Sequence, residues 1–129
     1  MDHIAEFFVG DTLTSITKTS LLPGGREVLV YTTLHGSIGM FVPFVSKDEI
    51  EIFKTIEMHL RNEIPNPCGR DHVQYRSYYF PVKNVIDGDL CEHYNMLPNE
   101  KKRQIADSLD RTVSEISKKL EDIRNRVAF

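Results

Sequence analysis

Four side chains near the middle of the chain are of the types that bind zinc: Cys68, His72, Cys91 and His93. Structural zinc sites usually combine two close ligand pairs, such as C-x2-C with H-x3-H. Here Cys68 and His72 lie in or beside a proline-rich connector, and Cys91 and His93 are two residues apart on an expected helix, so they point to different faces. This spacing favours ordinary thiols and imidazoles, and we expect neither a metal nor a cofactor.

Three carboxylates, Asp87, Asp89 and Glu92, are close enough in sequence for acid–base chemistry or a magnesium site. Acidic residues at the start of a helix have a simpler explanation. They accept hydrogen bonds from unpaired backbone N–H groups and face the positive end of the helix dipole, at about 1 kcal/mol each. No base or nucleophile accompanies them, so capping is their expected role.

Motifs that bind phosphate or activate a nucleophile are missing from the sequence. The segment Pro23-Gly-Gly-Arg26 lacks the Lys-Ser/Thr pair of a P-loop, and it leads into an expected strand where that motif needs a helix. No segment resembles a nucleophile elbow. The sequence therefore predicts a protein that is not an enzyme.

Basic and aromatic side chains alternate between residues 70 and 83, a composition that also occurs in surfaces that bind single-stranded nucleic acid. The alternative is that these rings pack inside the protein while the arginines neutralise nearby acids. The segment is not basic enough to follow a phosphate backbone, which favours packing. Direct RNA binding remains the alternative, and it would use Arg70, Arg76, Tyr79 and Lys83.

We call residues 70–86 the seam. This segment is too apolar for a linker and too irregular for one helix or strand, and it separates a β-rich half from a helical half. We expect it to dock the two halves together. The contacts are predicted to come from Arg70, Arg76, Tyr78, Tyr79, Phe80, Lys83, Asp87 and Asp89.

The β-rich half, residues 5–44, is predicted to be a four-strand antiparallel meander with strands near 5–9, 12–20, 27–34 and 37–44. Its strands are apolar on both faces: Val28 and Val30 alternate with Leu29 and Tyr31. A sheet with two apolar faces must be covered on both sides, as a propeller blade is between its neighbours. One blade cannot bury itself, so this pattern indicates part of a larger assembly.

The first helix is predicted over residues 46–63. Ser46 and Glu49 form a capping box, in which each side chain can satisfy a backbone N–H at the helix start. The apolar stripe that follows consists of Ile52, Phe53, Ile56, Leu60 and Ile64.

Later helices are predicted from caps as well. Asp71 is expected to cap a short helix to about residue 78, and Asp87 one to about residue 97. Pro98 suits the first position of a helix to about residue 109. Thr112 and Glu115 form a second capping box, followed by a stripe made of Val113, Ile116, Leu120, Ile123 and Val127. The predicted fold class is α+β, with residues 1–45 as the C-terminal part of a β-propeller and residues 46–129 as a helical domain.

The amino-acid composition limits which classes of protein this chain can belong to. The net charge is −3 with 40% hydrophobic residues, so no overall field attracts nucleic acid or membrane. Two cysteines without an apolar leader indicate free thiols in a reducing, intracellular compartment. No apolar run approaches the ~20 residues of a membrane span.

Several stretches resemble the C-terminal segment of the splicing factor 3b subunit 3 family, and the resemblance covers essentially the whole chain. They are residues 22–34, Gly36-Ser-Ile-Gly-Met-Phe-Val-Pro-Phe44, 57–61, Cys68-Gly-Arg-Asp-His72, 76–92 and 117–124. The wider family of triple-propeller proteins includes the damaged-DNA-binding protein 1 adaptor and the large cleavage and polyadenylation subunit. It shares mainly the Gly-x-Ile-Gly strand and the Ile-Asp-Gly-Asp-Leu turn. The departures lie at residues 46–53, 63–67, 95–107 and 113.

This resemblance implies a nuclear, non-enzymatic scaffold that acts in pre-mRNA splicing, in branch-site recognition by the U2-type small nuclear ribonucleoprotein. The implied partners are other splicing factor 3b subunits and further propeller blades of the same, much longer polypeptide, with pre-mRNA or snRNA contacted indirectly. Met1 would then be an artificial or gene-model start, and the isolated chain is expected to self-associate through its exposed blade. The alternative within the wider family is an adaptor for ubiquitin ligation or mRNA 3′-end processing.

Overall fold

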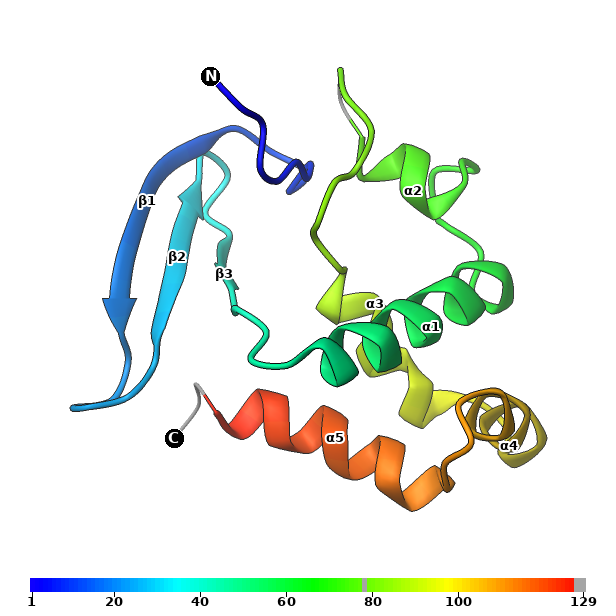
Figure 1. The fold of residues 1–129 in the computed structure, drawn as a ribbon. Helices are drawn as coiled ribbons and strands as arrows, with labels where there is room; N and C mark the ends of the chain where they lie inside the picture. The colour runs from blue at the N-terminus through cyan, green and yellow to red at the C-terminus, as the bar shows by residue number, and fades with distance from the viewer. Residues whose placement is uncertain (78, 127–129) are drawn as a thin grey trace.

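A computed structural model describes residues 1–77 and 79–126, with an antiparallel sheet followed by helices (Figure 1). The strands are β1 (Leu13–Ser20), β2 (Glu27–Thr33) and β3 (Ile38–Phe41). The helices are α1 (Lys47–Glu63), α2 (His72–Tyr75), α3 (Gly88–Glu92), the 3-10 helix η1 (His93–Met96), α4 (Asn99–Ser108) and α5 (Val113–Asn125). The predicted α+β class is therefore confirmed.

The sheet has the order β1-β2-β3, and both strand pairs are antiparallel. Leu29 in the central strand pairs with Lys18 on one side and Phe41 on the other. Gly36 turns the chain between β2 and β3 with φ +89°, a conformation that costs glycine little because it has no Cβ.

The expected first strand, near residues 5–9, is not part of this sheet, so the prediction of four strands was wrong. Glu6 instead forms an isolated antiparallel bridge with Lys83 of the seam. The Phe7 ring packs edge-on against Phe41, with ring centroids 6.0 Å apart. Gly10 (φ +99°) bends the chain between this segment and β1. An apolar side chain can pack on the face of a sheet as well as within a strand, and sequence alternation does not distinguish the two.

Much of the sheet has no cover in this chain. Val28 is almost fully buried, whereas most large apolar side chains of the strands remain exposed: Leu13, Ile16, Leu29, Ile38 and Met40. Among the described residues, the strands contact mainly each other and the helices mainly each other. Both observations agree with the two apolar faces seen in the sequence. Over residues 1–77 and 79–126 the sheet has three strands, so the four-stranded blade expected from the sequence is not shown.

Helix α1 is the centre of the helical half. Ser46 caps it and accepts a hydrogen bond from the Glu49 N–H at 3.3 Å, as the capping box predicts. The apolar stripe of α1 packs against the later helices to form one core. The buried residues of this core are Ile52, Phe53, Ile56, Leu60, Leu90, Cys91, Tyr94, Ile105, Ala106, Ile116 and Leu120. Burying each large apolar side chain stabilises the fold by about 1.5–3 kcal/mol, so this core holds the helices in place.

Three predicted helix boundaries need correction. Helix α2 ends at Tyr75 and not near residue 78, and Asp71 makes no side-chain capping bond to it. The helix after Asp87 ends as α-helix at Glu92 and continues as the tighter η1, which places Tyr94 in the core with its hydroxyl donating to the Lys102 carbonyl at 3.0 Å.

At the later boundaries, Pro98 occupies the N-cap of α4 and not its first helical position. The Thr112 cap of α5 is confirmed, since its hydroxyl accepts from the Glu115 N–H at 3.2 Å. Val127 and Tyr78 lie outside the described residues.

None of the helices in the described ranges has the length and apolar character that crossing a membrane requires.

Candidate functional site

The seam is hydrogen-bonded to the N-terminal segment, residues 3–8, at two places, and the two segments approach each other in Figure 1. Glu6 and Lys83 exchange two backbone hydrogen bonds of 2.9 Å, and the Phe8 N–H donates to the Arg76 carbonyl at 2.8 Å. Side chains add to the ladder: the Lys83 Nζ donates to the His3 carbonyl at 2.6 Å. The start of the chain is thus joined to a segment about 75 residues later, which joins the β-rich half to the helical half.

Asp87 is the most connected side chain of this region and only 4% exposed. Its Oδ2 accepts a hydrogen bond from Arg76 Nε at 2.8 Å. Its Oδ1 accepts from the backbone N–H groups of Asp89 at 3.1 Å and Leu90 at 3.4 Å, which is the predicted N-cap of α3. One carboxylate therefore links the seam to the start of a helix, and capping is the role of this acid.

Arg76 is committed to contacts within the protein. Its side chain is 15% exposed, and its Nη1 donates to the Phe8 carbonyl at 3.2 Å. The guanidinium lies over the rings of Phe7 and Tyr75, 4.9 and 5.1 Å from their centroids. A planar cation can hydrogen-bond at its edge and stack on its face at once, so this arginine joins the N-terminal segment, the seam and α3.

Two further titratable groups, His72 and Glu57, contact Asp87, and we call these two residues together with Arg76 and Asp87 the Asp87 cluster. The His72 Nε2 lies 2.8 Å from Asp87 Oδ2, an ion pair whenever the ring is protonated. Glu57 of α1 accepts a hydrogen bond from the Asp87 backbone N–H at 2.6 Å. Burial raises the pKa of Glu57, and this hydrogen bond opposes the rise. Helix α1 is thereby tied to the same point as α3 and the seam.

The remaining predicted contact residues that the structure describes have exposed side chains. Asp89, Lys83 and Phe80 are exposed, as is Arg70, and Tyr79 is 81% exposed. Of the four residues expected to bind RNA directly, Arg76 and Lys83 donate side-chain hydrogen bonds to backbone carbonyls of the N-terminal segment. Arg70, Tyr79 and Lys83 have exposed side chains, and the Lys83 ammonium is already hydrogen-bonded within the protein.

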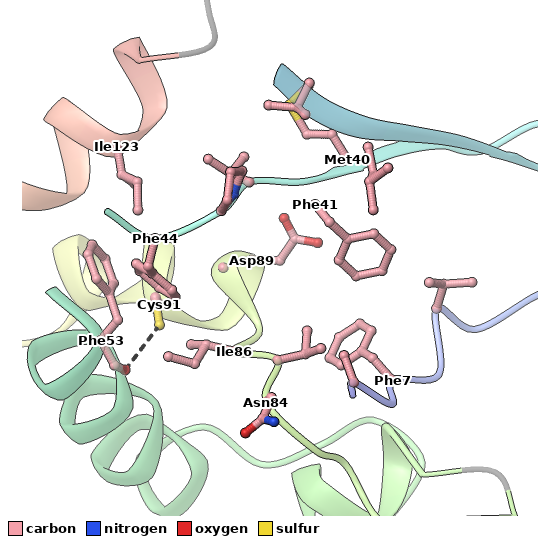
Figure 2. Close-up of a pocket in the computed structure, with 18 of the residues that line it drawn as sticks. Phe7, Met40, Phe41, Phe44, Phe53, Asn84, Ile86, Asp89, Cys91 and Ile123 are labelled. Atoms are coloured by element: carbon pink, nitrogen blue, oxygen red, sulfur yellow. Dashed lines mark hydrogen bonds between the residues drawn. The ribbon is translucent and has the colours of Figure 1, made fainter. Parts of the chain in front are cut away.

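The four possible zinc ligands have separate surroundings. Cys68 is exposed, His72 belongs to the Asp87 cluster, and the His93 Nδ1 lies 2.9 Å from the Asp89 carbonyl. Cys91 is buried and its Sγ points to the Phe53 carbonyl at 3.8 Å (Figure 2). Burial raises the pKa of this thiol. Over residues 1–77 and 79–126, no group of three or more His, Cys, Asp or Glu side chains is arranged to hold a metal ion.

A second buried ion pair was not predicted from the sequence. Glu49, 6% exposed, accepts hydrogen bonds from both terminal nitrogens of Arg126, just after α5. These bonds lower the pKa of Glu49 and link Arg126 to the start of α1. The capping box was the only signal at Glu49. Glu57 was also missed, although its place beside the buried stripe of α1 marks it as an acid near the core.

Comparisons with known proteins give one consistent result. A family model described as the CPSF A subunit region matches residues 1–96. The chain is 56% identical over 126 residues to splicing factor 3B subunit 3 of Danio rerio. It is 54% identical over 126 residues to probable splicing factor 3B subunit 3 of Dictyostelium discoideum, and 54% identical over 127 residues to spliceosome-associated protein 130 A of Arabidopsis thaliana. Each match covers 98% of this chain but only 10% of the relative, so the chain spans about a tenth of the length of these curated relatives.

Proposed function

The chain belongs to the CPSF A subunit region family, and from this premise we propose that it acts in pre-mRNA splicing as a non-enzymatic scaffold segment of a splicing factor 3b complex. The observation that carries the proposal is the identity of more than half of the residues, over 98% of the chain, to relatives from a fish, a slime mould and a plant whose names place them in splicing. Nuclear localisation and a part in branch-site recognition follow from the same proposal.

Other splicing factor 3b subunits and the rest of the same polypeptide are the proposed partners. The exposed apolar side chains of β1, β2 and β3 support this, since a sheet with exposed apolar residues on both faces is covered by other protein segments when it is part of a larger assembly. We propose that residues 1–45 complete a β-propeller with strands from elsewhere in the longer protein, and that residues 46–129 form its helical domain.

The proposed role of the seam is to dock this helical domain onto the propeller. The contacts that support it are the backbone hydrogen bonds of Glu6 with Lys83 and of Phe8 with Arg76, together with the side-chain bond of Arg76 to Asp87. Removing the Asp87 carboxylate would leave α3 without its cap and Arg76 without its ion pair, so the seam would be held less firmly to the helical domain.

Direct RNA binding is less well supported, because Arg76 serves as an internal contact. Substituting both Arg70 and Tyr79 by alanine leaves the Asp87 cluster intact and tests this alternative cleanly. Unchanged crosslinking to RNA in the folded double variant would remove the direct-binding function, whereas a lost crosslink would restore it.

The proposed function is tested by affinity purification of the complete protein that contains this chain, followed by mass spectrometry. We expect splicing factor 3b subunits to copurify in stoichiometric amounts. Recovery of ubiquitin-ligase or 3′-end-processing subunits in their place would show that the chain belongs to an adaptor of the wider family and would overturn the splicing assignment.

A further inference from the structure

The sheet and the helices do not pack fully against each other, and a cavity of about 1090 Å³ lies between them (Figure 2). Its walls come from the N-terminal segment, the three strands, the end of the seam, and helices α1, α3 and α5. Cavities that enclose a drug-sized molecule measure roughly 300–1,000 Å³. This one is large enough for several side chains of a polypeptide.

The cavity wall is mainly aromatic and aliphatic. Four phenyl rings line it, Phe7, Phe41, Phe44 and Phe53, and Figure 2 shows Ile123 of α5 among the aliphatic side chains beside them. Phe44 and Phe53 lie 5.4 Å apart between ring centroids, and Phe7 and Phe41 lie 6.0 Å apart in an edge-to-face arrangement. Because the rings support each other, the wall is preformed, and apolar groups that enter it gain contacts without a large cost of ordering.

The two basic side chains that line the cavity are paired with acids. The Lys18 Nζ lies 2.6 Å from Glu27 Oε2, and Arg124 pairs with Glu92. The carboxylate of Asp89 forms no ion pair with any residue in 1–77 or 79–126. Glu6, the other acid of the wall without a lysine or arginine partner, lies 3.5 Å from His3. The cavity therefore combines an apolar wall with an excess of negative charge, which includes Asp89.

The position of Asp89 directs this charge into the cavity. Its carboxylate stands beside Phe41 in Figure 2. Burial, followed by the charge of Asp89, raises the pKa of Tyr31 on the central strand, so the field of this carboxylate extends across to the sheet. A cation held here would meet both a carboxylate and ring faces, which attract cations as well.

We propose that this cavity binds an apolar peptide segment of a partner protein that carries one lysine or arginine among large apolar side chains. The apolar stem of such a basic residue lies along the phenyl rings while its head pairs with Asp89. This complementarity of charge selects a basic segment over a neutral or acidic one. The inference rests on the scaffold role proposed above and names the chemistry of one partner.

The test uses the 129-residue chain and a fluorescent synthetic peptide, acetyl-Phe-Leu-Lys-Leu-Phe-amide, in an anisotropy titration. Two matched peptides carry Gln or Glu at the central position. We expect the Lys peptide to bind about tenfold more tightly than the Gln peptide, and the Glu peptide more weakly still. Asp89→Asn should remove the difference between Lys and Gln, whereas Asp107→Asn, an exposed acid on α4, should preserve it. Leu29→Trp, which fills the cavity from β2, should weaken all three peptides.

Several outcomes would overturn the inference. Equal binding of the Lys, Gln and Glu peptides would remove the charge selection, and unchanged binding to Leu29→Trp would place the peptide elsewhere. Absence of peptide binding, together with a wild-type dimer that Leu29→Trp makes monomeric in analytical ultracentrifugation, would show that a second copy fills the cavity. Thermal unfolding of each variant confirms its fold. Because copurification of splicing subunits is measured separately on the complete protein, a failed peptide titration leaves the proposed function standing.

Discussion

Replacing Asp87 with alanine should be among the most destabilising single changes in this chain. The carboxylate is 4% exposed, binds Arg76 and caps α3 through two backbone N–H groups. Removing one partner of a buried ion pair costs about 3–5 kcal/mol, because the remaining charge loses its compensation. Loss of an N-cap costs about 0.5–2 kcal/mol. Both effects share one carboxylate and do not simply add, so we expect the free energy of unfolding to fall by about 4 kcal/mol.

Urea denaturation followed by circular dichroism measures this loss, and two variants separate its causes. Asp87→Asn keeps a good capping side chain but loses the charge, so it should retain about 1 kcal/mol more stability than Asp87→Ala. Asp71→Ala is the matched control, since Asp71 precedes α2 without a capping hydrogen bond and should change stability by less than about 0.5 kcal/mol. If Asp87→Ala proved as mild as Asp71→Ala, the cluster would not hold the seam and our reasoning would fail.

Three further predictions concern titration and thiol reactivity. The Arg126 contact lowers the pKa of Glu49, so its contribution to stability is present above the unfolded pKa and is lost as pH falls through the folded one; Glu49→Gln should flatten the acid limb of a stability–pH curve, and an unchanged limb would contradict the contact. Backbone hydrogen bonds lower the pKa of Asp11 from 3.8 to about 2, so its contribution should vanish only between these values, and an NMR titration giving an unshifted carboxyl would disprove the bonds. Exposed Cys68 should react quickly with a thiol reagent and buried Cys91 only on unfolding; equal rates would refute the burial.

Helices could be predicted from the sequence because their determinants are local. The capping residues Ser46, Asp87 and Thr112 lie within three positions of the N–H groups they satisfy, and the apolar stripes repeat within each helix. The errors lie in the cap expected from Asp71 and at helix boundaries such as Tyr75, where packing of the chain that follows decides how far a short helix extends.

Strand pairing depends on partners that are distant in sequence, and the prediction failed there. Residues 5–9 have the apolar character of a strand, but their backbone partner is Lys83 in the seam and not the neighbouring β1. Nothing in the local pattern distinguishes the two pairings, because each satisfies the same backbone groups.

The residue types of the candidate site could be read from the sequence, but their arrangement could not. Arg76, Lys83 and Asp87 were expected to make contacts, with packing favoured over RNA binding for the basic residues and helix capping as the expected role of Asp87. What decided between these roles was the carbonyl of Phe8 and the carboxylate of Glu57, which the fold brings from opposite directions. Such convergence of segments far apart in sequence has no signature in residue spacing.

The seam joins the N-terminal segment to the helical half through the hydrogen bonds of Arg76 and Lys83. Amide hydrogen exchange in the wild-type chain and in Arg76→Ala tests it most directly. We predict that the amides of Glu6, Phe8 and Lys83 lose their protection in the variant while those of Ile56 and Leu60 in α1 keep theirs. Unchanged protection at Glu6, Phe8 and Lys83 would contradict the claim.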